Sequence, residues 1–278
     1  MSAKVKETAK EEVQNVRKLA NDGLKSGAYM YPIKGIFYYV SHRSLWSPLV
    51  QKLAPTITLG LGVTTFMFVF TYLPQAAVMA FTSGPLAAIS AALLVLSESS
   101  TLTMVLSKAL IIEDSLIDTF DGTLVERGHP ALVAKERQVK GGGAGDVIAR
   151  LGKLAGKPFA KFTPKAIIRY FMYLPLNLIP VVGTVAFVVL QGKKFGPQAH
   201  SRYFQLKSMS GPQKERHVDE RKAAYTSFGI PAVLLEMVPI AGIFFAFTNT
   251  CGAALWAADL ETSGTTAPGL KEQAKKAE

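Results

Sequence analysis

The chain has 278 residues, of which 49% are hydrophobic and only 18% are charged, and its formal net charge is +11 at pH 7. This composition, with a mean hydropathy of +0.23, is typical of membrane proteins and disfavours a water-soluble enzyme. The single cysteine, Cys251, excludes an intramolecular disulfide, a cysteine-rich zinc site and an iron–sulfur cluster. No cofactor is expected.

The chain begins with a polar segment and ends with another. Residues 1–29 contain no apolar core of the kind that a cleavable secretory signal has, and they are expected to form an amphipathic or mobile segment. Residues 30–261 are the predicted membrane domain. Residues 262–278 are predicted to be a disordered tail.

The first membrane element is predicted from the absence of charge. Residues 53–107 contain one charged side chain, Glu98, and an uncharged Ser83-Gly84-Pro85 turn interrupts them. Two bilayer-length helices of about 20 residues each fit this run, so a long transmembrane hairpin is predicted. Glu98 would lie in the hydrocarbon region, where an acidic side chain is either functional or held by a hydrogen bond from a neighbouring helix. The small residues Gly60 and Gly62 would permit close helix packing within one chain or in a homo-oligomer.

A basic segment follows at residues 113–165 and is predicted to be a cytosolic insert. Within it, residues 144–162 have apolar side chains on one helical face and basic side chains on the other. This pattern is typical of a helix that lies on an anionic lipid surface. The basic residues expected to contact lipid headgroups are Arg150, Lys153, Lys157 and Lys161.

Two later apolar segments share a motif that contains proline. Residues 176–183 (LNLIPVVG) and 235–242 (LEMVPIAG) match without gaps at a separation of 59 residues. The motif predicts two proline-broken, re-entrant hairpins at 166–192 and 223–258, because irregular backbone in lipid must be shielded or turned back. Their turns would contain Pro180 and Gly183, and Pro239 and Gly242. One proline-kinked spanning helix is the alternative for the first of them.

The positions of the charges favour the hairpin interpretation. Residues 1–52, 108–169 and 193–222 each contain more basic than acidic residues. A single crossing at 170–192 would place one basic flank on the far side of the membrane, which the positive-inside tendency disfavours. With three hairpins, every charged segment faces the cytosol.

Four polar residues are candidates for an intramembrane site. Asn177 and Glu236 occupy the same position in the repeated motif, and with Glu98 and Asn249 they could form a small cluster. The alternative is that they satisfy backbone groups that the two prolines leave free.

Aromatic and basic residues beside the apolar segments are predicted to contact lipid headgroups. They are His42, Arg43 and Trp46 before the first hairpin, His200 and Arg202 after the second, and Trp256 in the third. The four histidines lack zinc-site spacing, so no metal site is expected. Lipid phosphates, with a neutral lipid core beneath them, are favoured over nucleic acid as the partners of the basic residues.

Several strings together resemble one family. They are YVSHRSLWSP (39–48), NLIPVVGT (177–184), GPQAHSRYF (196–204), LEMVP (235–239) and NTCGAALWAADLE (249–261). Over about residues 30–261 the chain resembles the fungal outer-spore-wall and lipid-droplet-in-sporulation proteins, a group similar to the wider etoposide-induced/CysZ-like superfamily. The resemblance implies long helices combined with partly inserted hairpins.

Three functions are weighed. The resemblance and the one-sided charges favour a non-enzymatic protein of the endoplasmic reticulum and lipid droplets that supplies lipid for membrane or spore wall assembly. The runner-up is an anion (sulfate) transporter, because the distant bacterial relatives are linked to sulfate uptake and helix N-termini could face a bound anion. A lipid-modifying enzyme that uses His42, His200 or Glu98 is the third, and no catalytic motif supports it.

Overall fold

The structure, a computed structural model, describes residues 21–139, 147–148, 151–152, 182–238 and 241–264. Three predicted parts lie mostly outside these residues: the N-terminal segment 1–29, the hairpin at 166–192 up to residue 181, and the tail 262–278. The amphipathic segment at 144–162 is also largely outside them.

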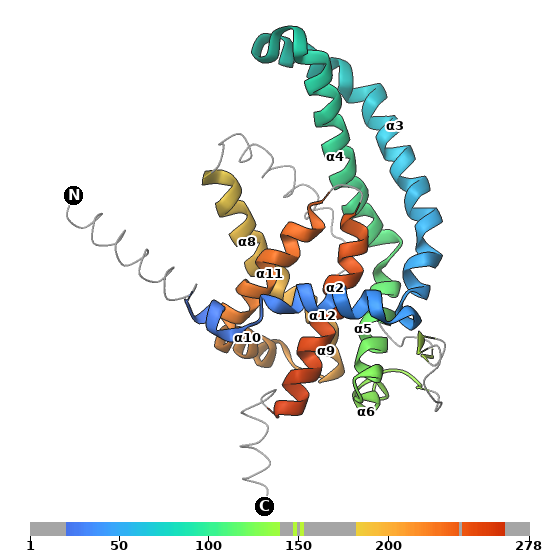
Figure 1. The fold of residues 1–278 in the computed structure, drawn as a ribbon, viewed down its shortest axis with the longest axis vertical. Coiled ribbons are helices and arrows are strands. Elements are labelled where there is room, and N and C mark those ends of the chain that lie inside the picture. Colours follow the sequence, from blue (N-terminus) through green and yellow to red (C-terminus); the bar gives the residue numbers. More distant parts are fainter. Residues whose placement is uncertain (1–20, 140–146, 149–150, 153–181, 239–240, 265–278) are drawn as a thin grey trace, which may run out of the picture.

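Two long helices project together from the rest of the protein (Figure 1). They are α3 (Ser47–Ser83) and α4 (Ala87–Leu110), joined by the short 3₁₀ helix η2 (Gly84–Leu86). Gly84 has φ +51°, a left-handed conformation that favours glycine, and it ends α3 at the predicted turn. Pro55 and Pro74 lie inside α3, where proline has no backbone N–H to donate to the helical hydrogen bonds.

The remaining helices form a bundle at the base of this hairpin. In chain order they are α2 (Met30–Ser41), the 3₁₀ helix η1 (Arg43–Leu45), α5 (Glu113–Glu126), α6 (Pro130–Val133), α8 (Val182–Ala199), α9 (Ser201–Leu206), α10 (Gly211–Glu220), α11 (Lys222–Glu236) and α12 (Gly242–Ser263).

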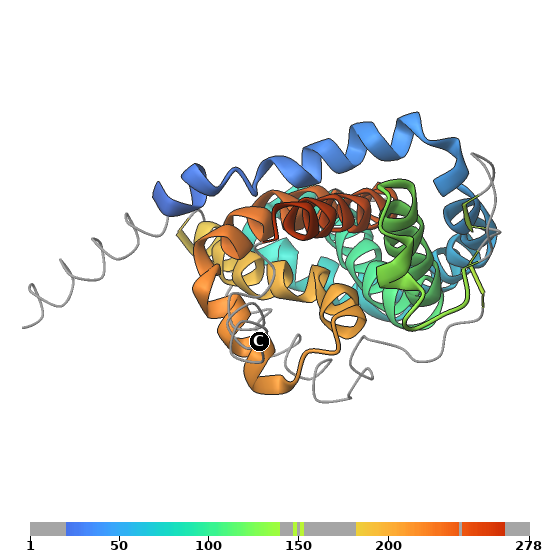
Figure 2. The ribbon, with the colours of Figure 1, turned by 90° about the horizontal axis from the view of Figure 1, so that it is seen from below.

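Helix α12 is the centre of the bundle. It contacts α2, α5, α8 and α11, and its residues Phe247, Cys251 and Trp256 are buried. Figure 1 shows α2 crossing α12, and Figure 2 shows the two helices next to each other. At the crossing, Gly35 lies against the backbone of Thr248, where a Cβ atom would overlap it. The absence of side chains at this crossing therefore allows the two helices to approach closely.

The predicted all-α membrane fold is confirmed. Within the described residues the only β-type pairing is an isolated bridge between Val139 and Leu151. Three helical segments, Ser47–Phe81, Gly84–Leu110 and Gly242–Ser263, are long and apolar enough to cross a membrane. In the most apolar 18-residue stretch of the first two segments, only 11% and 17% of the stretch is buried inside the protein. In that of the third segment, 72% is buried. The hairpin of α3 and α4 is therefore the part most open to lipid.

The first part of the predicted basic insert is a helix of the bundle. Residues 113–126 form α5, which packs against α12 and buries Ile117, Phe120 and Leu124. The acidic residues Glu113 and Asp114 lie in its first turn, where their negative charges interact favourably with the positive end of the helix dipole.

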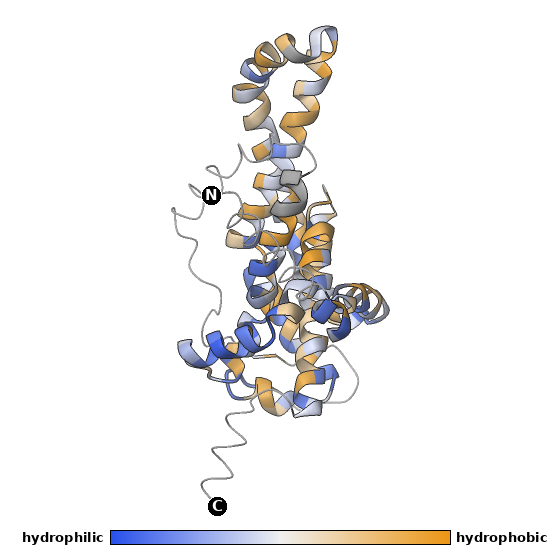
Figure 3. Cartoon of the chain, turned by 90° about the vertical axis from the view of Figure 1, so that its left-hand side faces the viewer, coloured by the Kyte–Doolittle hydropathy of each residue, from blue (hydrophilic) through white to orange (hydrophobic). Residues whose placement is uncertain are grey.

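Hydropathy divides the molecule along its length. In Figure 3 the projecting hairpin is mainly apolar, and the polar residues gather toward the opposite end, around α10 and the lower bundle. This arrangement fits a protein with one apolar arm in lipid and its polar mass beside it.

Candidate functional site: a membrane hairpin and a pocket at its base

The surface of the hairpin is mainly apolar between Leu53 and Ser107, where Glu98 is the one charged residue. Large side chains on α3 are exposed, including Leu61, Phe70 and Phe81, and the side chain of Phe81 beside the turn is 93% exposed. Exposed apolar surface on this scale is costly in water but favourable in lipid. The hairpin thus binds membrane lipid by its composition alone.

Glu98 is held within the hairpin. Gln75 of α3 donates a hydrogen bond from Nε2 to Glu98 Oε2 of α4 at 2.6 Å. A polar pair between two apolar helices joins them where water is scarce. This contact is the hydrogen-bonded arrangement expected under the structural interpretation of Glu98, and it does not by itself test a functional role.

Two other predicted residues meet where the hairpin joins the bundle. Asn249 of α12 donates from Nδ2 to Glu236 Oε1 at 3.2 Å and to the carbonyl oxygen of Ala232 at 2.9 Å. The other carboxylate oxygen of Glu236 pairs with Lys108 at the end of α4. An ion pair and an amide thus connect α4, α11 and α12.

The predicted four-residue cluster is therefore only partly formed. Glu98 precedes Lys108 by ten positions on α4, about 15 Å along the helix axis, and it contacts Gln75 instead. The expectation that Glu98 joins Glu236 and Asn249 is wrong, because the hairpin extends away from the bundle. Asn177 lies outside the described residues.

The predicted turn residues fall in different places. Pro180 and Pro239 lie outside the described residues, and Gly183 lies in the first turn of α8. Gly242 is the first residue of α12, and a Cβ atom there would overlap the carbonyl oxygen of Glu236 and the side chain of Met104. Glycine at position 242 thus permits the close return of the chain after α11.

The predicted headgroup contacts divide into three groups. His42 is partly exposed, and Arg43 and Trp46 are exposed, near the start of α3. Arg150, Lys153, Lys157 and Lys161 lie outside the described residues. His200, Arg202 and Trp256 are buried, with exposed fractions of 0%, 1% and 6%, so the prediction that they contact lipid headgroups is wrong.

Arg202 is buried because it has an acidic partner in the core. Asp121 of α5 accepts hydrogen bonds from Nε and Nη2 of Arg202 at 2.9 and 2.7 Å, and from Arg137 at 3.2 Å. Burial raises the pKa of Asp121, an effect that the two guanidinium groups oppose. Buried charges of this kind must be paired. Sequence analysis missed this network because Asp121 and Arg202 are far apart in the chain.

His200 is buried in an aromatic cluster with Trp256 and Tyr225. One ring nitrogen, Nε2, lies 2.9 Å from the carbonyl oxygen of Ala253, and the other, Nδ1, lies 3.0 Å from the hydroxyl of Tyr225. The neutral tautomer with hydrogen on Nε2 donates to Ala253 and accepts from Tyr225, so both nitrogens are satisfied. Burial lowers the pKa of His200 to about 3.

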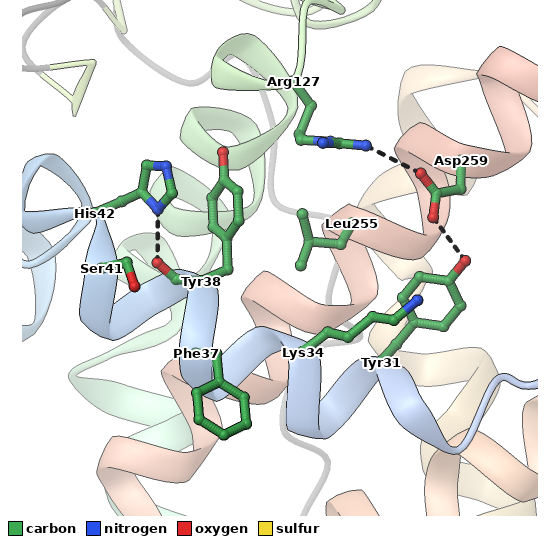
Figure 4. A pocket seen from close by; sticks show the side chains of 9 residues that line it. All are labelled: Tyr31, Lys34, Phe37, Tyr38, Ser41, His42, Arg127, Leu255 and Asp259. Carbon is green, nitrogen blue, oxygen red and sulfur yellow. Dashed lines mark hydrogen bonds and ion pairs between the residues drawn. The ribbon is translucent and has the colours of Figure 1, made fainter.

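A pocket of about 470 Å³ lies between α2, the end of α5 and α12. Figure 4 shows its lining: Tyr31, Lys34, Phe37, Tyr38, Ser41, His42, Arg127, Leu255 and Asp259. Asp259 accepts a hydrogen bond from the Tyr31 hydroxyl at 2.8 Å and pairs with Arg127 at 3.2 Å. Lys34 places its ammonium group 4.8 Å from the centre of the Tyr31 ring. The part of the chain that the structure describes contains no group of three His, Cys, Asp or Glu side chains suited to a metal ion.

The chain is similar in sequence to two outer spore wall proteins of yeast. The chain is 20% identical over 245 residues to the outer spore wall protein LDS1 of Saccharomyces cerevisiae. This alignment covers 86% of this chain and 72% of that protein. It is 31% identical over 122 residues to the outer spore wall protein RRT8 of the same yeast, covering 41% of this chain and 35% of that protein.

A family match covers most of the helical domain described above. Residues 31–246, from α2 into α12, match the family described as "Sulfate transporter CysZ/Etoposide-induced protein 2.4". The exposed apolar hairpin, the bundle at its base and this match lead to one conclusion: the chain is a helical membrane protein that belongs to the CysZ/etoposide-induced protein 2.4 family.

Proposed function

We propose that the protein is anchored by α3 and α4 in the endoplasmic reticulum and on lipid droplets, and that it supplies lipid for spore wall or membrane assembly without catalysing a reaction. Its charged segments would face the cytosol. The observation that carries the proposal is the projecting hairpin, whose exposed surface is apolar up to and including its uncharged turn.

The physical reason concerns the far end of the hairpin. A lipid droplet has one phospholipid monolayer over neutral lipid, so a protein with charged loops beyond its helices would bury charge in hydrocarbon. Residues 74–86 include no charged side chain, and the described polar segments lie toward the opposite end of the molecule. Such a hairpin can remain inserted when the protein moves from a bilayer to a droplet.

The link to wall assembly rests on the relatives. Both yeast proteins similar to this chain are named as outer spore wall proteins, and the alignment with the first covers 86% of the chain. A supply of lipid to a growing wall or membrane would connect that assignment with a droplet-compatible anchor.

The experiment is fluorescence microscopy of a tagged full-length protein together with a neutral-lipid dye. Fluorescent rings around stained droplets, continuous with the endoplasmic reticulum, are the expected result. Confinement to the plasma membrane would contradict the proposal.

A pair of variants tests the role of the turn. Phe81→Lys with Ser83→Lys places two charges at the far end, and we expect this variant to stay in the reticulum and leave droplets. Val50→Lys with Leu53→Lys adds the same charge beside Lys52 at the base and is expected to reach droplets normally. Equal droplet signal from both variants would contradict the idea that charge at the far end of the hairpin excludes the protein from droplets.

Anion transport is the second candidate, favoured by the family description, which includes a sulfate transporter. The ion pair of Glu236 and Lys108 beside the start of α12 would be the site to test. Sulfate uptake by vesicles that contain the purified protein, abolished by Glu236→Gln, would favour this candidate over the lipid function. An equal flux in vesicles without protein would oppose it.

A further inference from the structure

We propose that the pocket between α2, α5 and α12 binds the phosphate-bearing headgroup of an anionic phospholipid. This inference rests on membrane insertion of the hairpin and not on delivery to droplets, so the two proposals can fail separately. The depth of the pocket, its charges and its apolar wall support it.

The pocket lies at the depth of the lipid headgroups. The last charge before the apolar run is Lys52, five positions into α3 and thus about 8 Å along the axis from Ser47. A headgroup layer is roughly 5–8 Å thick on each side of the hydrocarbon core. Helix α2 ends at Ser41, and the chain reaches α3 through the three-residue η1, so the end of α2 where Ser41 and His42 line the pocket lies in this layer.

The orientation of α2 agrees with this depth. In Figure 1 α2 runs across the direction of α3 and α4, as a helix in the plane of a membrane surface would. Its exposed apolar residues Met30, Ile33, Phe37 and Val40 follow helical spacing along one stripe. An exposed apolar stripe on a helix in this position is typical of insertion among lipid headgroups.

The charges of the pocket favour an anion. Asp259 is its single acidic lining residue, and this carboxylate already accepts a hydrogen bond from Tyr31 and pairs with Arg127. Lys34 makes no ion pair within the described residues, and its ammonium group lies over the ring of Tyr31. Within the described residues, Lys34 therefore has no acidic partner. A second cation, Arg127, lines the same pocket. Figure 4 shows these two side chains reaching the pocket from different helices.

The remaining lining suits a lipid better than a small inorganic ion. Phe37 is 70% exposed and Leu255 is buried, so the pocket combines an apolar wall with the cations. A volume of about 470 Å³ is within the usual range of roughly 300–1,000 Å³ for ligand pockets. A phosphate could contact Lys34 and Arg127 while the glycerol and first acyl carbons lie against Phe37.

Native mass spectrometry of the full-length protein in a neutral detergent tests the inference. Dioleoyl phosphatidic acid, dioleoyl phosphatidylcholine and inorganic phosphate are added in separate titrations. We expect one phosphatidic acid molecule to bind per chain more tightly than phosphatidylcholine. Lys34→Gln should raise its dissociation constant about tenfold, the loss expected for one charge-assisted hydrogen bond, and Lys34→Arg should restore binding.

Arg43→Gln is the matched control. It removes the same charge one residue after His42, but Arg43 does not line the pocket, so the dissociation constant of this variant should stay near that of the unchanged protein. Equal weakening by Lys34→Gln and Arg43→Gln would overturn the inference in favour of diffuse surface attraction. Equal binding of phosphatidylcholine, or displacement of the lipid by an equal concentration of inorganic phosphate, would overturn it as well. Circular dichroism verifies that each variant is folded.

Discussion

At the residue scale, the same side-chain types occur both on the surface and in the buried core. His42, Arg43 and Trp46 lie at the base of the hairpin and are at least partly exposed, whereas His200, Arg202 and Trp256 are in the core. Both groups were predicted to contact headgroups because histidine, arginine and tryptophan are amphipathic and lie in or beside apolar segments. What separates them is the partner: Asp121 for Arg202, and Ala253 with Tyr225 for His200. Such partners are distant in sequence and become visible only in the fold.

His200 predicts a dependence of stability on pH. Its pKa falls from 6.5 to about 3 on folding, because burial disfavours the charged ring. The unfolded chain therefore binds more protons below about pH 6.5, and stability is lost as the pH falls from 6.5 toward 3, by up to about 1.4 kcal/mol per unit. The stabilising contribution is complete above about pH 6.5.

Thermal unfolding in detergent at about pH 7.5 and about pH 5 measures this effect. His200→Gln, which cannot be protonated but retains a donor for Ala253, should show a smaller loss of unfolding temperature on acidification. His129→Gln changes a partly exposed histidine and should behave as the unchanged protein does. An identical acid response in all three proteins would show that His200 is not the responsible group.

At the element scale, the hairpin was predictable and α5 was not. The near absence of charge over residues 53–107 is a local property of the sequence. In lipid such a run forms membrane-spanning helices, because the backbone polar groups must be hydrogen-bonded within the segment. Helix α5 has acids at Asp118 and Asp121 among its apolar residues, so its sequence also fits a polar insert. Its burial depends on α12 and on the arginines that pair with those acids, which no local pattern contains.

The crossing of α2 and α12 predicts a strong effect of adding one methyl group. A Cβ atom at Gly252 would overlap the backbone of Tyr31 and Pro32, so Gly252→Ala should separate the helices and cost about 1–3 kcal/mol of unfolding free energy. Gly62→Ala is the control, because no atom lies within 4 Å of its added Cβ and alanine favours a helix over glycine by about 1 kcal/mol. The unfolding temperatures of the two variants should therefore shift in opposite directions. A neutral Gly252→Ala would argue against this close crossing.

At the scale of the whole molecule, the polar segments are expected to share one side of the membrane. Cys251 is the single cysteine and is buried, so a Cys251→Ser protein provides a background for new cysteines. Lys135→Cys and Glu215→Cys are on exposed positions of the bundle, and Ser83→Cys is beside the turn. We expect a membrane-impermeant maleimide, added from the cytosolic side, to label the first two and not the third. Labelling of positions 135 and 215 from opposite sides would contradict the one-sided arrangement.

The length of α3 predicts that the hairpin fits a droplet monolayer better than a thin bilayer. The uncharged part of α3, from Leu53 to Ser83, extends about 46 Å, well beyond the hydrocarbon thickness of about 27 Å in the endoplasmic reticulum. In so thin a bilayer the helix must tilt or bend, and Pro74 is a natural position for a bend. Beneath a monolayer no opposite surface limits the helix. Hydrophobic mismatch would then be relieved on transfer to a droplet, so the hairpin could sort this protein by membrane thickness without a receptor.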